Sequence, residues 1–405
     1  MHDVIIVGAG ASGLVTAIVS ARRGKRVLIL EKNTRVGKKL LATGNGKCNI
    51  TNQRPATERY YSSNPHFIYK VFEGYSYQSV KQFFRSIGLE LIEAKEGKVF
   101  PMSLQASSVV ELLLAECREL GVEVRCKVEV ERIERVGELY EIKYNSGIEI
   151  AKAIVIATGH LSAPQLGGVD SGIVFAKRLG HTTIKSFPSL VQLTSPIKKL
   201  ERIAGVKVES RVSLKTCEGR VIQRQGDVLF TSYGISGLAI LDISRFVIVE
   251  LLKKKSIMLT IDLMPKMSQE QLLALMRKSL VKKSSKPLTI WLQGFINKKL
   301  ILPILEPLKL KNETIGSLYA NRKSLEDIVY KIKNFEFEVN GSRGYRGAEV
   351  ATGGVNTKEI NPKTMESKKH KGLYFTGEVL DVDGDRGGFN LHFAWVCGLR
   401  AGGSI

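Results

Sequence analysis

The spacing of apolar residues is most regular at the start of the chain. Val4 to Val7 is a short apolar run that ends at Gly8, and from Leu14 to Ala21 apolar residues recur at i, i+3, i+4 and i+7. A second apolar run over residues 26–30 ends at Glu31. This pattern predicts a strand, a glycine turn, a helix and a second strand, the unit that opens a doubly wound parallel sheet.

The rest of the chain changes its periodicity several times. Helices are predicted over residues 78–88 and 107–120, and strands over 122–125, 128–133, 140–144 and 153–157. After Pro188, apolar residues alternate with polar ones, as at Val206, Val208, Val212 and Leu214, which predicts an antiparallel segment. A further apolar strand is expected from Leu373 to Thr376, followed by a helix after Asn390.

These patterns predict an α/β fold in which both chain ends build one domain. The Rossmann-like nucleotide-binding domain is expected to comprise residues 1–189 and 341–405, and a second domain, residues 190–340, is inserted between them. The insert is expected to be β-rich over 190–244 and 334–340. Residues 245–333 are rich in Lys and Leu and are expected to form a helical cap.

Composition narrows the class of protein. The chain has 405 residues, enough for two or three domains, and 43% hydrophobic residues, which excludes a wholly disordered chain. The five cysteines are scattered and lack zinc-ligand spacing, so neither a disulfide scaffold nor a structural metal is expected. No apolar run reaches the ~18 residues of a membrane span, and no signal peptide is recognisable. We therefore expect a cytoplasmic protein.

Charge raises the question of an anionic partner. The formal net charge is +22, and residues 245–333 hold 18 Lys and Arg against 7 Asp and Glu, an excess of +11. Nucleic acid, a membrane surface or a phosphate-bearing small molecule would each suit it. Trp291, Phe295 and Tyr319 are too sparse for a base-stacking platform. A solvated helical face is the preferred interpretation, and nucleic acid is not the expected partner.

The glycine turn carries the clearest chemistry. Gly8-Ala9-Gly10-Ala11-Ser12-Gly13 is a GxGxxG loop between a strand and a helix, and Glu31 ends the second strand 18 residues after Gly13. Gly8 permits the tight turn, Gly10 lets a pyrophosphate approach the backbone, and Gly13 allows close helix packing. The carboxylate of Glu31 can accept hydrogen bonds from an adenosine ribose. The loop therefore predicts a dinucleotide site.

Two further segments favour FAD over NAD. Ala157-Thr158-Gly159 ends a buried strand, and Gly377-Glu378-Val379-Leu380-Asp381 follows another. Asp381 is placed where it can bind a ribityl chain. Gly387-Gly388-Phe389-Asn390 precedes a helix, whose positive end can stabilise negative charge on a reduced flavin.

The sequence also resembles a known family. The block from Lys38 to Asn52, with Thr43-Gly44-Asn45-Gly46-Lys47-Cys48, resembles the signature of bacterial NAD(P)/FAD-dependent oxidoreductases that include aminoacetone oxidase and 3-dehydro-bile-acid reductase. The resemblance continues over residues 230–237, 350–355, 364–368 and 372–395. It departs from the family pattern at residues 166–172 and 384–386, so the substrate is not inherited from it.

The resemblance implies an enzyme with FAD as cofactor and NAD(P)H as a transient electron donor. The FAD contacts that the motifs and the resemblance together indicate are Gly8, Ala9, Gly10, Ser12, Gly13, Glu31, Lys32, Lys39, Thr43, Gly44, Asn45, Gly46, Val130, Ala157, Thr158, Gly159, Gly377, Glu378, Asp381, Gly388, Phe389, Asn390 and Leu391. Lys32, Lys38 and Lys39 are expected to face the FAD phosphates. No second GxGxxG unit is present for a nicotinamide dinucleotide.

Candidates for proton transfer are weaker. His160, His370 and His392 are considered because histidine titrates near neutrality, although a structural role is the preferred interpretation for each. Arg343, Tyr345 and Arg346 precede a returning strand and could bind an anionic substrate, with Tyr345 relaying a proton. Cys48 is interpreted as a packing residue.

The hypothesis from the sequence is an FAD-dependent oxidoreductase. It would transfer hydride between a small organic substrate and NAD(P)H or O₂ through the bound flavin. The alternative is an FAD-containing RNA-modifying or RNA-binding protein, motivated by the charge. A flavin-binding redox sensor is a third possibility.

Overall fold

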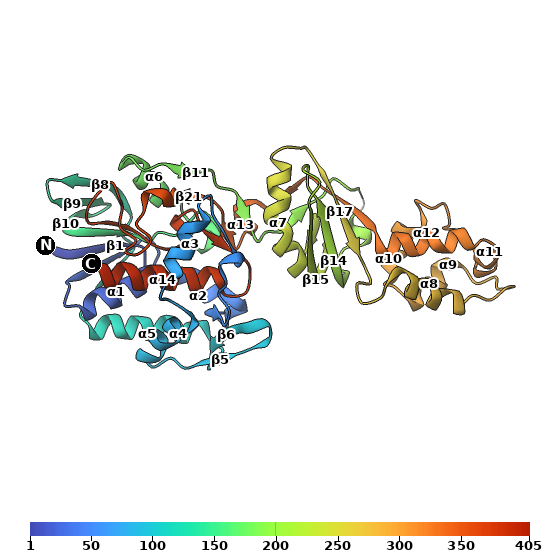
Figure 1. Ribbon diagram of the computed structural model, residues 1–405, viewed down its shortest axis with the longest axis horizontal. Coiled ribbons are helices and arrows are strands. Elements are labelled where there is room, and N and C mark those ends of the chain that lie inside the picture. The colour runs from blue at the N-terminus through green and yellow to red at the C-terminus, as the bar shows by residue number, and fades with distance from the viewer. Residues whose placement is uncertain (199) are drawn as a thin grey trace. The chain divides into compact units, whose positions relative to one another are not determined.

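The computed structural model describes residues 1–198 and 200–405, which fold into two units with separate apolar cores (Figure 1). Unit 1 comprises residues 1–188 and 348–405, and unit 2 comprises residues 189–347. Residues 341–347 had been placed with the chain ends from the sequence. They belong to unit 2, because Gly341 and Ser342 pair with Leu193 and Thr194 in its sheet.

Unit 1 is built on a seven-stranded sheet. Its order is β7 (Glu123–Cys126), β2 (Val27–Glu31), β1 (His2–Val7), β10 (Gly147–Ile156), β9 (Leu139–Tyr144), β8 (Val130–Val136), with β22 (Leu373–Phe375) also paired to β10. The pairs among β7, β2, β1, β10 and β22 are parallel, whereas β9 pairs antiparallel with both β8 and β10. The parallel sheet is therefore the core that the first thirty residues predict.

The composition of the central strands follows from their position. Val27 to Glu31 is buried throughout, as are Val4 to Val7. A parallel strand covered on both faces reads as a continuous apolar run rather than an alternating one. Strand β22 comes from the C-terminal segment and joins this sheet, so both chain ends are needed to complete it.

Helices pack around this sheet, and the predicted ones at residues 78–88, 107–120 and after Asn390 are confirmed. They are α1 (Ala11–Arg22), α2 (Lys38–Ala42), α3 (Pro65–Phe72), α4 (Tyr77–Ser86), α5 (Ala106–Glu119), α6 (Ser171–Arg178) and α14 (Phe389–Ser404). Helix α14 packs along α1, where the backbone at Gly398 and Gly402 approaches Ser12 and Thr16 too closely for any side chain. Trp395 of α14 is fully buried against Phe84, with ring centroids 5.1 Å apart.

Short strand pairs fix the loops of unit 1. These are β3 (Thr51–Asn52) with β6 (Lys98–Pro101), which also pairs with β5 (Leu91–Glu93); β4 (Tyr60–Tyr61) with β23 (Asp383–Gly384); and β11 (Thr183–Ile184) with β21 (Gly354–Val355). The pairs β3–β6, β4–β23 and β11–β21 each connect two segments that are distant in sequence.

Unit 2 contains an antiparallel sheet, as the alternation after Pro188 predicts. The order is β18 (Phe335–Val339), β17 (Ile257–Asp262), β14 (Lys207–Lys215), β15 (Val221–Thr231), β16 (Gly234–Ser236), β13 (Leu193–Thr194), β19 (Gly341–Ser342). The expected division into β-rich and helical segments was wrong at two places. Strand β17 lies inside the stretch expected to be helical, and α7 (Leu238–Leu251) begins inside the stretch expected to be β-rich and packs on β14 and β15.

The remaining helices of unit 2 are mostly grouped after β17. They are α8 (Gln269–Lys278), α9 (Leu288–Trp291), α10 (Lys298–Leu305), α11 (Ile315–Ala320), α12 (Arg322–Lys333) and, after β19, α13 (Gly344–Gly347). We call residues 263–333 the helical subdomain. No helix in the described part of the chain is both long and apolar enough to cross a membrane.

Candidate functional site

The candidate site lies at one edge of the unit 1 sheet. Strands β1, β2, β10 and β22 run parallel, so the residues that follow their last positions meet at the same edge. Those residues are the glycine loop after Val7, Glu31 at the end of β2, Ala157 after β10, and Thr376 after β22. Ligands of open α/β sheets bind in the crevice at this edge.

The three glycines of the loop have distinct environments. A Cβ on Gly8 would lie 2.5 Å from the carbonyl oxygen of Ala157, and a Cβ on Gly13 would lie 2.1 Å from that of Gly8. By contrast, a Cβ on Gly10 would meet no atom within 4 Å. Gly8 and Gly13 are therefore required by packing within the protein, while Gly10 borders open space.

Helix α1 begins at this open space without a side chain to cap it. The N-cap is Gly10, which has no side chain to accept a hydrogen bond, and no acidic residue lies in the first turn. The first N–H groups of a helix have no partner within the helix, and they carry partial positive charge. A helix start of this kind favours a phosphate group over other ligands.

Glu31 is buried and is held by the backbone of the glycine loop. One carboxylate oxygen accepts a hydrogen bond from the Ala9 N–H at 2.8 Å, and the other accepts from the backbone and side-chain nitrogens of Asn33 at 2.8 and 2.7 Å. These contacts fix the carboxylate beside the loop. Its orientation fits an acceptor for ribose hydroxyls next to a bound pyrophosphate.

Helix α1 also links the loop to the C-terminal segment. The Ser12 hydroxyl is hydrogen-bonded to both the carbonyl and the hydroxyl of Thr376, each at 3.2 Å. At Gly377 the backbone has a φ of +74°, and a Cβ there would lie 2.7 Å from the Ser12 hydroxyl oxygen. The close approach positions the Gly377–Asp381 segment at the start of α1.

Glu378 is the centre of a polar network at this edge. Its carboxylate accepts hydrogen bonds from the Lys39 ammonium at 2.8 Å, the Ser162 hydroxyl at 2.8 Å and the Ala351 N–H at 2.9 Å. Burial raises the pKa of Glu378, but the charge and hydrogen bond of Lys39 outweigh it, so the pKa lies below its ordinary value. Lys39 thus pairs with a carboxylate and not with an open phosphate position.

Lys32 forms an ion pair at the surface. Its ammonium binds the carboxylate of Glu129 at 2.6 Å, and both side chains are exposed. Val130 follows at the start of β8, where it is buried. Lys32 stays, with the neighbouring Glu31, a proposed contact for the cofactor.

The turn after β10 brings Ala157, Thr158 and Gly159 to the same edge. The Ala157 N–H donates to the carbonyl of Val7 at 2.9 Å, and Gly159 has a φ of +70°. His160 follows and is buried, with one ring nitrogen 2.9 Å from the Ser186 hydroxyl and the other accepting from the Leu161 N–H. Burial lowers the pKa of His160, so the neutral ring predominates at neutral pH.

The segment from Thr43 to Gly46 forms an exposed turn after α2. Gly44 and Asn45 have φ values of +57° and +55°, which lie in the left-handed region. The Thr43 hydroxyl donates to the Leu40 carbonyl, and the turn leads to the buried Cys48. Burial raises the pKa of the Cys48 thiol to about 11, so it remains protonated, as expected of a packing residue.

Asp381 and the start of α14 complete the candidate flavin contacts. The Asp381 carboxylate accepts from the Ser63 N–H at 2.9 Å and from the Ser63 hydroxyl. Asn390 uses its side chain to hold the Gly384 backbone, accepting from the N–H at 2.7 Å and donating to the carbonyl at 2.8 Å. Gly388, with a φ of +96°, is the N-cap of α14, Phe389 is buried, and Leu391 packs partly buried on the core. Asn390 thus positions the loop before α14, and a Cβ on Gly388 would lie 2.4 Å from the Thr51 carbonyl oxygen, so the N-cap packs closely on β3.

His392 does not fit the role of an acid that titrates near neutrality. Its ring is fully buried, one nitrogen lies 2.8 Å from the Thr51 hydroxyl, and the other has no hydrogen-bond partner. Burial lowers its pKa to about 3. The sequence expectation rested on the ordinary pKa of histidine, which this environment removes.

Tyr345 and Arg346 lie in α13 of unit 2, and the neighbouring Arg343 stacks on Tyr233 with 4.7 Å from its guanidinium carbon to the ring centroid.

The contacts that sequence reasoning missed at the unit 1 edge are Ser162, Ser63 and the Ala351 N–H. Ala351 lies within the block 350–355 that carries part of the family resemblance, whereas Ser63 and Ser162 belong to no motif, and each of the three contributes through a partner that is distant in sequence.

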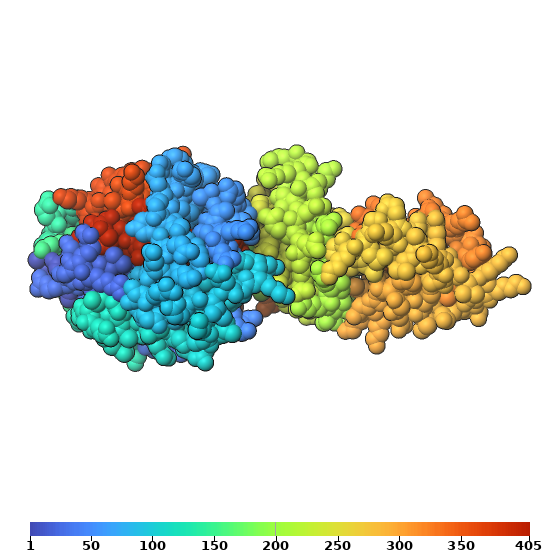
Figure 2. Space-filling model, turned by 60° about the horizontal axis from the view of Figure 1, so that its bottom comes forward, coloured from blue at the N-terminus to red at the C-terminus, as the bar shows by residue number. Residues whose placement is uncertain are grey.

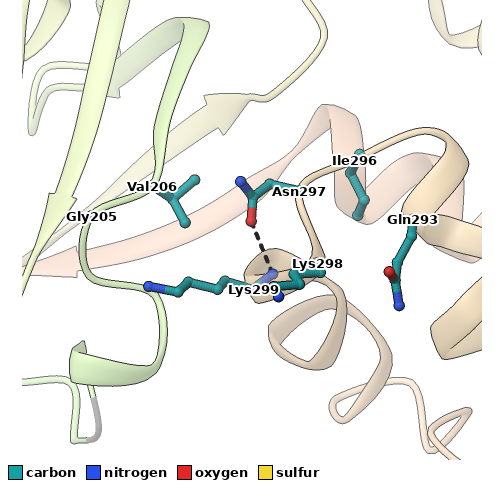
Figure 3. Close-up of a pocket in the computed structure, with 7 residues that line it drawn as sticks. All are labelled: Gly205, Val206, Gln293, Ile296, Asn297, Lys298 and Lys299. Carbon is teal, nitrogen blue, oxygen red and sulfur yellow. Dashed lines mark hydrogen bonds between the residues drawn. The ribbon is translucent and has the colours of Figure 1, made fainter.

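Unit 2 has a separate concavity beside the start of α10, of about 380 Å³ (Figure 3). Two of its polar residues are engaged within the protein: Asn297 caps the helix by accepting from the Lys299 N–H, and the Lys299 ammonium donates to the Ala204 carbonyl at 2.7 Å. Among the described residues, no group of three or more His, Cys, Asp or Glu is placed to bind a metal. The unit 1 sheet edge is therefore the stronger candidate.

The chain is similar to characterised proteins over its whole length. A 3-dehydro-bile acid delta(4,6)-reductase from Clostridium scindens is 34% identical over 99% of this chain and 98% of its own. A ribosomal RNA dihydrouridine synthase from Haemophilus influenzae is 34% identical over 96% and 95%, and one from Escherichia coli is 31% identical over 97% and 95%.

Solved structures show the same fold. A 3-ketosteroid-delta4-(5alpha)-dehydrogenase from Rhodococcus jostii RHA1 has a TM-score of 0.51 at 15% identity, covering 100% of this chain and 96% of that one. A flavocytochrome c3 fumarate reductase has a TM-score of 0.51 at 16% identity, covering 99% and 77%. The family model described as HI0933-like protein Rossmann domain matches residues 2–404. The chain thus belongs to the HI0933-like family.

Proposed function

We propose that this protein reduces a carbon–carbon double bond that is conjugated with a carbonyl group. The proposal is carried by what two full-length relatives share. One is named as a reductase of 3-dehydro-bile acids at the delta(4,6) position, and the other as a synthase of dihydrouridine. Each name describes the addition of two hydrogens to a carbon–carbon double bond, and in both substrates that bond is conjugated with a carbonyl group.

The residues at the unit 1 edge fit the cofactor for this chemistry. The uncapped start of α1 and the open space at Gly10 suit the pyrophosphate, and Glu31 suits the adenosine ribose. Asp381 and the start of α14 would hold the flavin end. Bound FAD supplies the hydride acceptor and donor that no side chain can provide.

The hydrogen bonds around Glu378 hold parts of the protein at this site in place. Lys39, Ser162 and the Ala351 N–H together hold an ionised carboxylate in one orientation. The network connects α2, the turn after β10 and the segment after β22. It therefore holds the proposed cofactor contacts of these three segments in fixed positions relative to one another.

Electrons would come from NADH or NADPH. The sequence contains no second GxGxxG unit, so the nucleotide is proposed to dock transiently at the flavin. Tyr345 remains the proposed proton donor and Arg346 a proposed contact for an anionic substrate.

The test is steady-state oxidation of NADH and NADPH under anaerobic conditions. A conjugated enone such as 2-cyclohexenone should support turnover, whereas the isomer with an isolated double bond should not. If neither nucleotide reduces the flavin and an aminoketone or amine does, the protein works as an oxidase and the proposal is wrong.

Uridine within ribosomal RNA is a second candidate substrate. Two relatives are named for that product, and the net charge of +22 suits a polyanionic substrate. Incubating ribosomal RNA that lacks the modification with protein and NADPH should increase the mass of one uridine by the mass of two hydrogens. Reduction of free enones without any change in RNA would assign a small molecule instead.

A further inference from the structure

The basic excess of the helical subdomain is not used by the site in unit 1. Six exposed basic side chains lie at two segment ends: Lys278, Lys282, Lys283 and Lys286 at and after the end of α8, and Arg322 and Lys323 at the start of α12. Their charge needs its own explanation.

The fold brings these two segments together at one end of the subdomain. Arg277, the penultimate residue of α8, forms an ion pair with Glu326 of α12 at 2.9 Å. The Gly316 N–H of α11 donates to the Ser284 carbonyl at 2.9 Å, and the Ile315 N–H donates to the Lys286 carbonyl at 3.0 Å. At Gly316 a Cβ would lie 2.9 Å from the Ser284 carbonyl oxygen, so the lysine-rich loop packs directly on α11. We call these six residues the basic end.

The charges of the basic end are not neutralised within the protein. None of the six side chains forms an ion pair with a carboxylate in the described part of the chain. The acidic residues of the same segments are Glu313, Glu326 and Asp327, and Glu326 is already paired with Arg277. Holding unpaired like charges close together costs free energy, which a bound polyanion would recover.

The surface between these charges is only slightly apolar. Val281 is 59% exposed, and Tyr319 of α11, close to Arg322 in sequence, is 45% exposed. Figure 2 shows the chain near residue 280 on the outer surface of the helical subdomain. Leu275 of α8 and Ile290 of α9 are also exposed, at 44% and 54%, but these side chains lie on separate elements, whereas a membrane-binding helix presents one continuous apolar face. A surface with many basic side chains and few exposed aromatic rings, Tyr319 and Tyr330, suits a nucleic acid, where phosphate contacts dominate affinity.

We propose that the basic end of the helical subdomain binds the phosphate backbone of a folded RNA. The inference rests on the proposed function with RNA as its substrate, and it assigns to unit 2 the contacts that hold that substrate. Lysine contacts to phosphate carry little information about the RNA sequence. The basic end would therefore supply affinity for RNA, and the site in unit 1 would select the base.

The experiment is a filter-binding titration of the full-length protein with purified bacterial ribosomal RNA at several salt concentrations. The variant changes Lys282→Gln, Lys283→Gln, Lys286→Gln and Lys323→Gln. We expect about tenfold weaker binding at low salt, and a slope of log affinity against log salt that is reduced by about 3, because each lost phosphate contact removes 0.7–0.9.

A matched control carries four Lys→Gln changes at exposed, unpaired positions of unit 1: Lys143, Lys177, Lys358 and Lys371. It should bind RNA as the unmodified protein does. Equal losses in both variants, or no RNA binding by the unmodified protein at low salt, would overturn the proposal. So would binding of the basic end to vesicles of equal parts phosphatidylserine and phosphatidylcholine in preference to RNA.

Turnover of 2-cyclohexenone is measured on the same three proteins to separate the two proposals. If the enone is reduced while RNA is not bound at the basic end, the surface is wrongly assigned and the proposed reductase stands. If RNA binding depends on the basic end but no unsaturated carbonyl is reduced, the proposed function fails and the surface remains.

Discussion

The glycines at the unit 1 edge differ in whether they are needed for ligand binding or for folding. Gly8 and Gly13 are enclosed by backbone atoms of the protein, whereas Gly10 faces open space in a conformation that other residues can adopt. A substitution at Gly10 therefore tests the ligand without testing the fold.

Gly10→Ala should weaken FAD binding at least about tenfold, because its methyl group would occupy space that a pyrophosphate needs. The melting temperature of the FAD-free protein should not fall. Equilibrium titration with FAD and thermal unfolding without it measure the two effects. Gly294→Ala in unit 2, which also meets open space, is the control, and an FAD affinity equal to the control's would contradict this assignment.

Lys39→Met should destabilise the protein by about 2 kcal/mol at pH 7, because it leaves a partly buried carboxylate without its cation. The native pKa of Glu378 lies below its ordinary value, so the ionised group stabilises the fold above that value and the contribution is lost as pH falls. The destabilisation should therefore shrink below about pH 4.5.

Urea unfolding at several pH values measures this difference. Lys32→Met breaks an exposed ion pair with Glu129 and should change stability by less than about 0.5 kcal/mol. A loss for Lys39→Met that does not vary with pH would show that the ion pair is not its cause.

Residue roles were the hardest features to predict from the sequence. Glu31 and the glycines follow from a motif whose parts are close in sequence. Lys32 and Lys39 were expected to face phosphates, yet their partners lie 97 and 339 positions away. His392 was assigned an ordinary pKa because a sequence does not report burial.

At the scale of elements, the contact between α1 and α14 joins the two chain ends. It depends on glycines of α14 that face α1 without a side chain. Gly377, which precedes α14 in the same C-terminal segment, also packs against Ser12 at the start of α1.

Gly398→Ala should destabilise the protein by about 1–3 kcal/mol, because the added methyl carbon would lie 2.8 Å from the Ser12 carbonyl oxygen and from Val15. FAD affinity should fall with it, since both helix starts shift. Gly403→Ala meets no atom within 4 Å and should stabilise by about 0.5 kcal/mol or less, because alanine favours the helix. Thermal unfolding of both variants tests the pair, and equal effects would mean that α14 is not closely packed at Gly398.

The elements themselves were predicted well where one periodicity persists. The strand, helix and strand from His2 to Glu31 were recognisable because buried parallel strands are apolar throughout. Strand β17 was missed because Ile257–Asp262 is a short apolar run between lysine-rich segments, and such runs fit helix or strand equally.

At the scale of the whole molecule, the chain forms two units, each with its own hydrophobic core. Unit 1 contains the sheet edge that fits FAD, and unit 2 contains an antiparallel sheet and most of the unexplained positive charge. Charge composition alone could not decide between a solvated surface and a partner. The clustering of six unpaired basic residues at one end of the helical subdomain now favours a polyanion.

We propose above all that the reduced flavin transfers its electrons to a double bond conjugated with a carbonyl. The most direct measurement is a single turnover without oxygen, in which flavin-reduced protein is mixed with 2-cyclohexenone. The spectrum of oxidised flavin should return with one cyclohexanone formed per flavin. A flavin that stays reduced with every unsaturated carbonyl, including uridine in ribosomal RNA, and is oxidised only when O₂ is admitted would contradict the account.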